Sequence, residues 1–151
     1  MKKLIVVVAG VLFLGGTGLA LAHSGATGIV KERMEVMKSV GAEMKVIAGM
    51  LQGKIGFDAG RLEQAARVIK GHAEKIEHLF PDGSDHKPTR ALPEVWHDKP
   101  EFDKLGKELA QAAQTLALKA SKAKAAGEVK MEIMAVGTNC KTCHKKFRAP
   151  E

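Results

Sequence analysis

Residues 129–147 have the sequence VKMEIMAVGTNCKTCHKKF. Their apolar side chains recur at steps of three and four residues, which places them on one stripe of an α-helix. The pattern therefore predicts a helix near the C-terminus whose inner face carries both cysteines of the chain. The stripe consists of Val129, Ile133, Val136, Cys140, Cys143 and Phe147.

Three earlier segments, residues 30–51, 62–80 and 102–116, show the same spacing. Only 4% of the residues are aromatic, and β-branched residues are sparse beyond the first dozen positions, which argues against a β-sheet protein. Four amphipathic helices without strands predict an all-α antiparallel four-helix bundle. In the first helix, the expected inner stripe is Val30, Met34, Met37, Gly41, Met44, Ala48 and Leu51.

The breaks between these segments carry helix-capping residues. Thr27, Asp58 and Asp98 stand where the first, second and third helices would begin, and such side chains accept hydrogen bonds from free backbone N–H groups. Pro100 would lie in the first turn of the third helix, where proline is tolerated. We expect the longer connection over residues 81–98, which contains three prolines, to cross one end of the bundle.

The N-terminus has the features of an export signal. Lys2 and Lys3 precede an apolar run, and Ala20-Leu21-Ala22 is a cleavage site of the small-x-small type. We expect residues 1–22 to be removed, which leaves one bundle domain of residues 23–151 in the periplasm without stable membrane insertion. An uncleaved N-terminal anchor is the alternative.

The composition is that of an ordinary globular domain, with 151 residues, 45% hydrophobic and 27% charged. The formal net charge is +7, but Lys and Arg alternate with Glu and Asp, as on solvated helix faces. An exported protein does not routinely meet nucleic acid, so we expect no nucleic-acid partner. The basic bias could instead steer an acidic partner protein or an anionic membrane surface.

One motif carries the chemistry, Cys140-Lys141-Thr142-Cys143-His144. On a helix both thiols point to one side, where each can add to a vinyl group of haem, and the adjacent imidazole can bind the iron. The sequence thus predicts one covalently attached haem c, and the C-terminal helix of the bundle is the haem-attachment helix. A zinc site would need further ligands from scattered histidines, a thioredoxin-like dithiol needs a βαβ setting, and a Cys140–Cys143 disulfide would leave His144 unexplained.

The sequence resembles the class II cytochromes c, the cytochrome c′ group, over nearly all of residues 23–151. The resemblance implies that Cys140 and Cys143 form the thioethers and that His144 is the proximal iron ligand. The matching elements are Arg33-x-x-x-Met37, Phe57-Asp58, Leu79-Phe80-Pro81, Pro93-Glu94-Val95-Trp96, Phe102-Asp103, and the cysteine motif followed by Phe147-Arg148.

The family has two branches that differ at the distal face of the iron. In one branch the distal position is apolar and unligated, and the high-spin iron binds small gases such as nitric oxide or carbon monoxide. In the other a methionine ligates, and low-spin iron carries electrons. The resemblance places Met37 at the distal position, which favours the low-spin Met/His-ligated branch. Met34 and Met44 are lesser candidates, and all three could instead be core fillers.

Three further residues are secondary candidates around the haem. Arg33 could pair with a haem propionate, because Arg binds carboxylates in a bidentate manner. Trp96 could pack on the haem edge, and Arg148 could border the proximal pocket. Each has an ordinary alternative as a surface or connector residue. His23, which cleavage would make the first residue, is a weak candidate for binding copper.

These features predict a periplasmic mono-haem c-type cytochrome that carries single electrons with His144 and Met37 as axial ligands. The alternative is a five-coordinate protein that binds gases, and a third possibility is a haem-free helical protein that handles metals. We expect no enzyme, because the sequence offers no acid–base pair or activated nucleophile. We expect a redox partner that docks electrostatically, and homodimerisation is compatible with the family resemblance.

Overall fold

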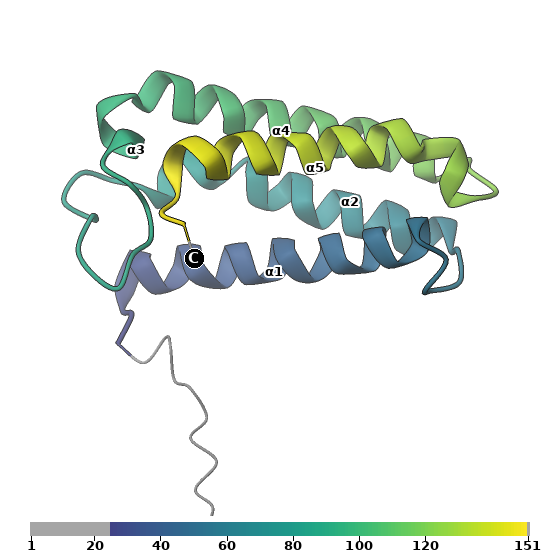
Figure 1. The fold of residues 1–151 in the computed structure, drawn as a ribbon, viewed down its shortest axis with the longest axis horizontal. Helices are drawn as coiled ribbons and strands as arrows, with labels where there is room; N and C mark the ends of the chain where they lie inside the picture. The colour runs from purple at the N-terminus through teal and green to yellow at the C-terminus, as the bar shows by residue number, and fades with distance from the viewer. Residues whose placement is uncertain (1–24, 151) are drawn as a thin grey trace, which may run out of the picture.

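The computed structural model describes residues 25–150, and these residues form an all-helical bundle (Figure 1). The long helices are α1 (Gly28–Leu51), α2 (Ala59–Ala73), α4 (Lys99–Ala120) and α5 (Lys130–Phe147), joined by the short α3 (Glu94–His97) and two 3-10 turns, η1 (Ile76–Leu79) and η2 (Ala126–Val129). The predicted antiparallel four-helix bundle is confirmed. The proposed signal over residues 1–22 and His23 both lie outside the described residues.

The helices do not pack equally against one another. The closest packing joins α2 and α4, α5 lies along α4, and α1 lies along α2, whereas α1 and α5 touch at few points. Large side chains fill the centre, among them Ile47, Leu62, Ile69, Leu116 and Val136, and each contributes about 1.5–3 kcal/mol through burial. Between residues 25 and 150, no helix combines the length and apolar character needed to cross a membrane.

The predicted capping residues behave differently from one another. Asp58 caps α2, since its carboxylate accepts a hydrogen bond of 2.8 Å from the Arg61 backbone N–H. Thr27 precedes α1 but makes no side-chain cap. Asp98 precedes α4, yet its carboxylate pairs with Lys146 of α5 at 2.7 Å instead of capping the helix. Pro100 lies in the first turn of α4, as expected.

The second helix ends earlier than its apolar spacing predicts. We expected the helix to reach Phe80, but α2 stops at Ala73 and the chain tightens into η1. Tightening of a final turn is common at helix ends, because 3-10 bonds satisfy carbonyls that an α-helix leaves free. The change directs Leu79 and Phe80 into the core, where both are buried.

The stripe expected to be innermost on α1 is only partly correct. Val30 is fully buried, but Met34, Met37, Met44, Ala48 and Leu51 are partly buried and Gly41 is exposed. The difference arises because α1 packs most closely on α2, which buries the side of α1 turned away from α5. The buried residues of α1 are Val30, Arg33, Val40, Ile47, Gly49 and Met50.

The long connection crosses one end of the bundle, as predicted (Figure 1). It is tied to the end of α5 by backbone bonds, from the Leu92 N–H to the Phe147 carbonyl at 3.0 Å and from the Ala149 N–H to the Arg90 carbonyl at 2.9 Å. An isolated bridge between Ala91 and Arg148 belongs to the same junction, and the described residues form no β-strand. The connection therefore lies next to the turn of α5 that carries His144.

Candidate haem site

Two contacts with α2 fix the orientation of α1. Ser39 hydrogen-bonds His72 at 3.0 Å, and Glu43 pairs with Arg61 at 2.6 Å. Successive side chains on an α-helix turn by about 100°. Met37, Gly41 and Met44 therefore lie on the opposite flank of α1, the flank away from α2.

Two contacts with α4 orient α5 in the same way. Glu132 pairs with Lys119, and Lys146 pairs with Asp98 at 2.7 Å. The opposite flank of α5 carries Gly137 and His144, which are seven residues apart and so lie above one another. In an antiparallel bundle these two opposite flanks face each other across the α1–α5 interface.

Packing across this interface is sparse. The helices α1 and α5 make little contact, although each packs along its other neighbour. A Cβ atom added at Gly41 or at Gly137 would meet no atom within 4 Å. Met37 and Met44 are partly buried and pack against the core on the same flank of α1. We call the region between Met37, Gly41 and Met44 of α1 and Gly137 and His144 of α5 the α1–α5 slot.

Both cysteines lie on the core-facing side of α5, between the flank that contacts α4 and the flank that carries Gly137 and His144. They are free thiols, partly buried and packed against the core. Burial raises the pKa of Cys140, and burial together with the Cys140 thiol raises the pKa of Cys143 to about 11. Burial therefore favours the protonated thiol at both positions.

His144 is partly buried at the end of α5. Burial lowers its pKa, and the positive charges of Arg148 and Arg90 lower it further. The imidazole is therefore neutral at neutral pH, which is the form that binds a metal. No group of three or more His, Cys, Asp or Glu side chains that could hold a metal occurs within residues 25–150, so the zinc alternative finds no support in this part of the chain.

The comparisons with known proteins agree with this geometry. Residues 28–148 match the family model described as Cytochrome C′. The chain belongs to the cytochrome c′ family. It is 38% identical over 150 residues to a cytochrome c′ of Rhodopseudomonas palustris, covering 99% of this chain and 98% of that protein.

Other relatives carry the name cytochrome c-556. One from the same organism is 27% identical over 151 residues and covers 97% of both chains. Among solved structures, cytochrome c′ from Rhodopseudomonas palustris superposes with a TM-score of 0.76 at 35% identity, covering 83% of this chain and 99% of that one. These matches confirm both the class II cytochrome c family and the four-helix bundle.

As a cytochrome c′ family protein, the chain binds a covalently attached haem c, and the slot has the donors this group requires. Two thiols on one side of α5 can hold the porphyrin, and the neutral imidazole next to them can bind iron. Gly41 and Gly137 leave room for a flat ring on both sides. Sequence reasoning singled out Gly41 but missed Gly137, which its spacing of seven residues from His144 would have revealed.

Arg33 is 4% exposed and its guanidinium is engaged by the connection between η1 and α3. It donates hydrogen bonds to the Leu79 carbonyl at 3.4 Å, to the Ser84 hydroxyl at 3.1 Å and to the Ser84 carbonyl. It also lies over the Phe80 ring at 4.7 Å and the Trp96 ring at 5.9 Å. Burial lowers the pKa of Arg33, and Asp85 opposes that effect. These contacts show that Arg33 fixes the connection to α1. Its contact with a haem propionate stays a prediction.

Trp96 and Arg148 flank the same end of the bundle. The Trp96 indole donates to the Pro81 carbonyl at 3.0 Å and packs edge-on against Phe80, so it is held in the same group of contacts as Arg33 and Phe80. Arg148 is exposed and close enough to His144 to lower its pKa. Its predicted place beside the proximal pocket is therefore compatible with the structure.

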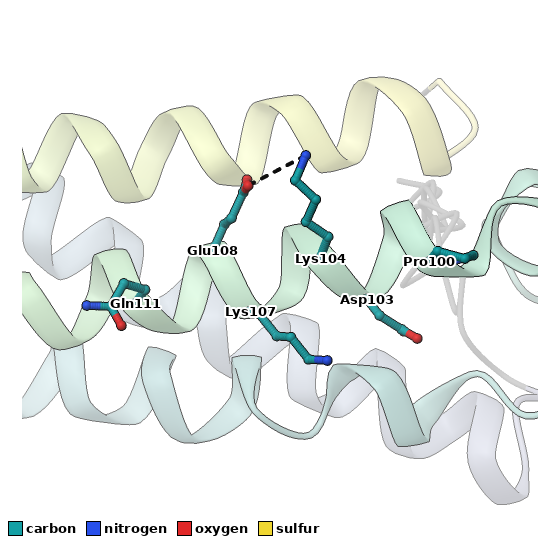
Figure 2. Close-up of a pocket in the computed structure, with 6 residues that line it drawn as sticks. All are labelled: Pro100, Asp103, Lys104, Lys107, Glu108 and Gln111. Atoms are coloured by element: carbon teal, nitrogen blue, oxygen red, sulfur yellow. Dashed lines mark ion pairs between the residues drawn. The ribbon is translucent and has the colours of Figure 1, made fainter.

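A shallow hollow of about 620 Å³ lies elsewhere, along the outer face of α4 (Figure 2). Its lining residues are Pro100, Asp103, Lys104, Lys107, Glu108 and Gln111. The charged side chains there are already paired, Lys104 with Glu108 at 3.8 Å and Lys107 with Glu77 at 3.6 Å. This face is a solvated helix surface remote in sequence from the cysteine motif, and we assign it no ligand.

Proposed function

We propose that this member of the cytochrome c′ family binds small gases at the open position of a five-coordinate haem in the α1–α5 slot. The observation that supports this proposal is the higher sequence identity to a cytochrome c′ than to a cytochrome c-556. Identity is 38% to a cytochrome c′ and 27% to a cytochrome c-556 of the same organism, each over almost the whole chain. This favours gas binding, the alternative predicted from the sequence, over electron transfer, the main prediction.

When bound, the haem supplies an iron that changes between ferrous and ferric and can take a sixth ligand. Cys140 and Cys143 would anchor its edge, and His144 would hold the iron from the proximal side. Met37 and Met44 would line the distal side. These side chains bring no charge or strong hydrogen-bond donor, so the distal space favours small uncharged ligands over anions.

A second function, electron transfer with Met37 as the sixth ligand, is supported by a separate observation. Met37 lies on the flank of α1 that faces the slot, and its thioether is a known axial ligand of haem iron. The cytochrome c-556 relatives also extend over most of this chain. The two functions therefore differ in what a single side chain does.

The optical spectrum of the ferrous holoprotein with carbon monoxide separates the two functions. Gas binding predicts a high-spin spectrum that shifts on addition of carbon monoxide, in the wild type and in Met37→Leu alike. Electron transfer predicts a low-spin spectrum resistant to carbon monoxide, which Met37→Leu converts to high-spin. Met34→Leu, on the same helix, is the matched control and should leave the spectrum unchanged under either function. The low-spin outcome would contradict our main proposal.

We also propose that the protein works in the periplasm after removal of residues 1–22, exchanges electrons with a partner protein and catalyses no substrate conversion. A cytochrome c′ that is 31% identical to this chain has an unusual ligand-controlled dimer dissociation. By this similarity we propose a homodimer that responds to ligand. Sedimentation of the holoprotein with and without carbon monoxide tests it, and a monomer under both conditions would refute it.

A further inference from the structure

Exposed lysines border the α1–α5 slot on both sides. On α1, Lys38 and Lys45 lie one helical turn beyond Met34 and Gly41, at the outer edge of the flank that faces α5. On α5, Lys141 and Lys145 follow Gly137 at steps of four residues and run along the corresponding outer edge. We call these four residues the lysine rim.

No acidic side chain neutralises the lysine rim in the part of the chain that the structure describes. None of its four members forms an ion pair there, whereas Lys31, Lys119 and Lys146 all do. Between Glu132 and Glu151 the sequence contains no Asp or Glu. The open edge of the slot thus carries a concentrated positive field.

Apolar side chains are exposed beside the lysine rim. Met131 is 72% exposed and Met134 is 50% exposed, and they follow one another at a step of three residues on α5. Met134 lies on the slot side of the helix, seven residues before Lys141. Flexible methionines are adaptable contact residues, so Met131 and Met134 add exposed apolar area at one edge of the lysine rim.

We propose that the lysine rim together with Met131 and Met134 forms the docking surface for an acidic electron-donor protein. The proposal rests on the proposed function, because both functions need the iron to be reduced. In the exchange one electron leaves the donor, which is oxidised, and reaches the iron, which is reduced, while no bond or proton is transferred. Clustered carboxylates on the donor would meet the lysines, and apolar side chains beside them would cover the methionines.

Binding of a probe protein tests the docking surface without any electron transfer. The probe is an oxidised flavodoxin of net negative charge, titrated by calorimetry against the ferric holoprotein at low ionic strength. The double variant Lys38→Glu/Lys145→Glu reverses one charge on each side of the slot and should weaken binding about tenfold. The matched control, Lys122→Glu/Lys124→Glu, makes the same change in net charge at the opposite end of α5 and should weaken binding less than about twofold. Raising the salt to about 0.15 M should screen the charges, so that the wild type and both double variants bind the probe with similar affinity.

Equal losses in both double variants would overturn the proposal, because net charge alone would then explain binding. Equal binding by the wild type and both double variants at low ionic strength would overturn it as well. Retention of the wild type on phosphatidylglycerol vesicles at 0.15 M salt, lost in Lys38→Glu/Lys145→Glu, would assign the surface to a membrane and refute a protein partner. The carbon monoxide spectrum of the same samples reports on the gas-binding function separately, so failure of one proposal is not read as failure of the other.

Discussion

At the scale of single residues, Arg33 is the buried charged group that holds the connection between η1 and α3 against the bundle. Its guanidinium donates to two carbonyls and a hydroxyl and lies over the rings of Phe80 and Trp96. A planar fork with several donors can make all of these contacts at once, whereas the ammonium of lysine cannot. Removing the side chain would leave buried carbonyls without partners.

We expect Arg33→Ala to lower the free energy of unfolding by about 2–4 kcal/mol. Arg33→Lys should recover only part of this loss. Lys45→Ala, an exposed position on the same helix, serves as the control and should change stability by less than about 0.5 kcal/mol. Urea denaturation of each variant provides the measurement.

The same series decides between the two roles considered for Arg33. A clamp on the connection stabilises the protein with or without haem, so the loss should appear in both the haem-loaded chain and a chain without haem. A contact with a haem propionate would produce a loss in the haem-loaded chain alone. That second pattern would contradict the role that the contacts of Arg33 indicate.

At the scale of the helices, the contrast between Asp58 and Thr27 offers a matched comparison. Both precede a long helix, but only Asp58 accepts a hydrogen bond from a free backbone N–H. Asp58→Ala should therefore cost about 1 kcal/mol, while Thr27→Ala should cost less than about 0.5 kcal/mol. Midpoints of urea unfolding measure both, and equal costs for the two substitutions would show that the cap at Asp58 contributes nothing.

Helix α5 combines two faces with separate tasks. Its inner stripe packs in the core through Ile133, Val136 and Phe147, whereas the flank with Gly137 and His144 borders the slot. Burial of Ile133, Val136 and Phe147 sets the rotation of the helix, and the ion pairs of Glu132 and Lys146 with α4 are consistent with that rotation. A helix of this kind positions an attached group through contacts on its opposite side.

At the scale of the whole molecule, the sparse contact between α1 and α5 implies that the bound group completes the bundle. The haem would bury the half-exposed flanks of both helices, and any group that binds only the folded state adds to its stability. The extensive contact between α2 and α4 does not depend on that group. We therefore expect a division into two halves, in which α2 and α4 keep their packing without the bound group while α1 and the facing flank of α5 depend on it.

Replacing both thiols, Cys140→Ala/Cys143→Ala, should prevent covalent attachment and lower the stability by about 3 kcal/mol, or roughly 10 °C in Tm. Amide hydrogen exchange should accelerate most in α1, while α2 and α4 stay protected. Thr142→Ala, within the same motif, is the control and should behave as the wild type. Uniform loss of protection across all helices would contradict the division into two halves.

The sequence alone determined the helical class, the positions of the four long helices and the haem-attachment motif. These follow from local regularities, since a spacing of three and four residues produces an amphipathic helix in almost any context, and Cys140, Cys143 and His144 are adjacent in the chain. The family resemblance on the same residues agreed with the comparisons. Spacing does not determine whether the Met37 sulfur binds the iron, because a core methionine and an iron ligand occupy the same helix position.

Only the tertiary structure decided which stripe of α1 is deepest, where α2 ends and what Arg33 contacts. Burial depends on which neighbouring helix lies closest, and the partners of Arg33 come from Leu79 and Ser84, 46 and 51 residues away along the chain. The open space at Gly41 and Gly137 likewise exists because two helices distant in sequence fail to pack against each other. Contacts between distant segments are set by the sum of all packing in the core, and no local pattern encodes that sum.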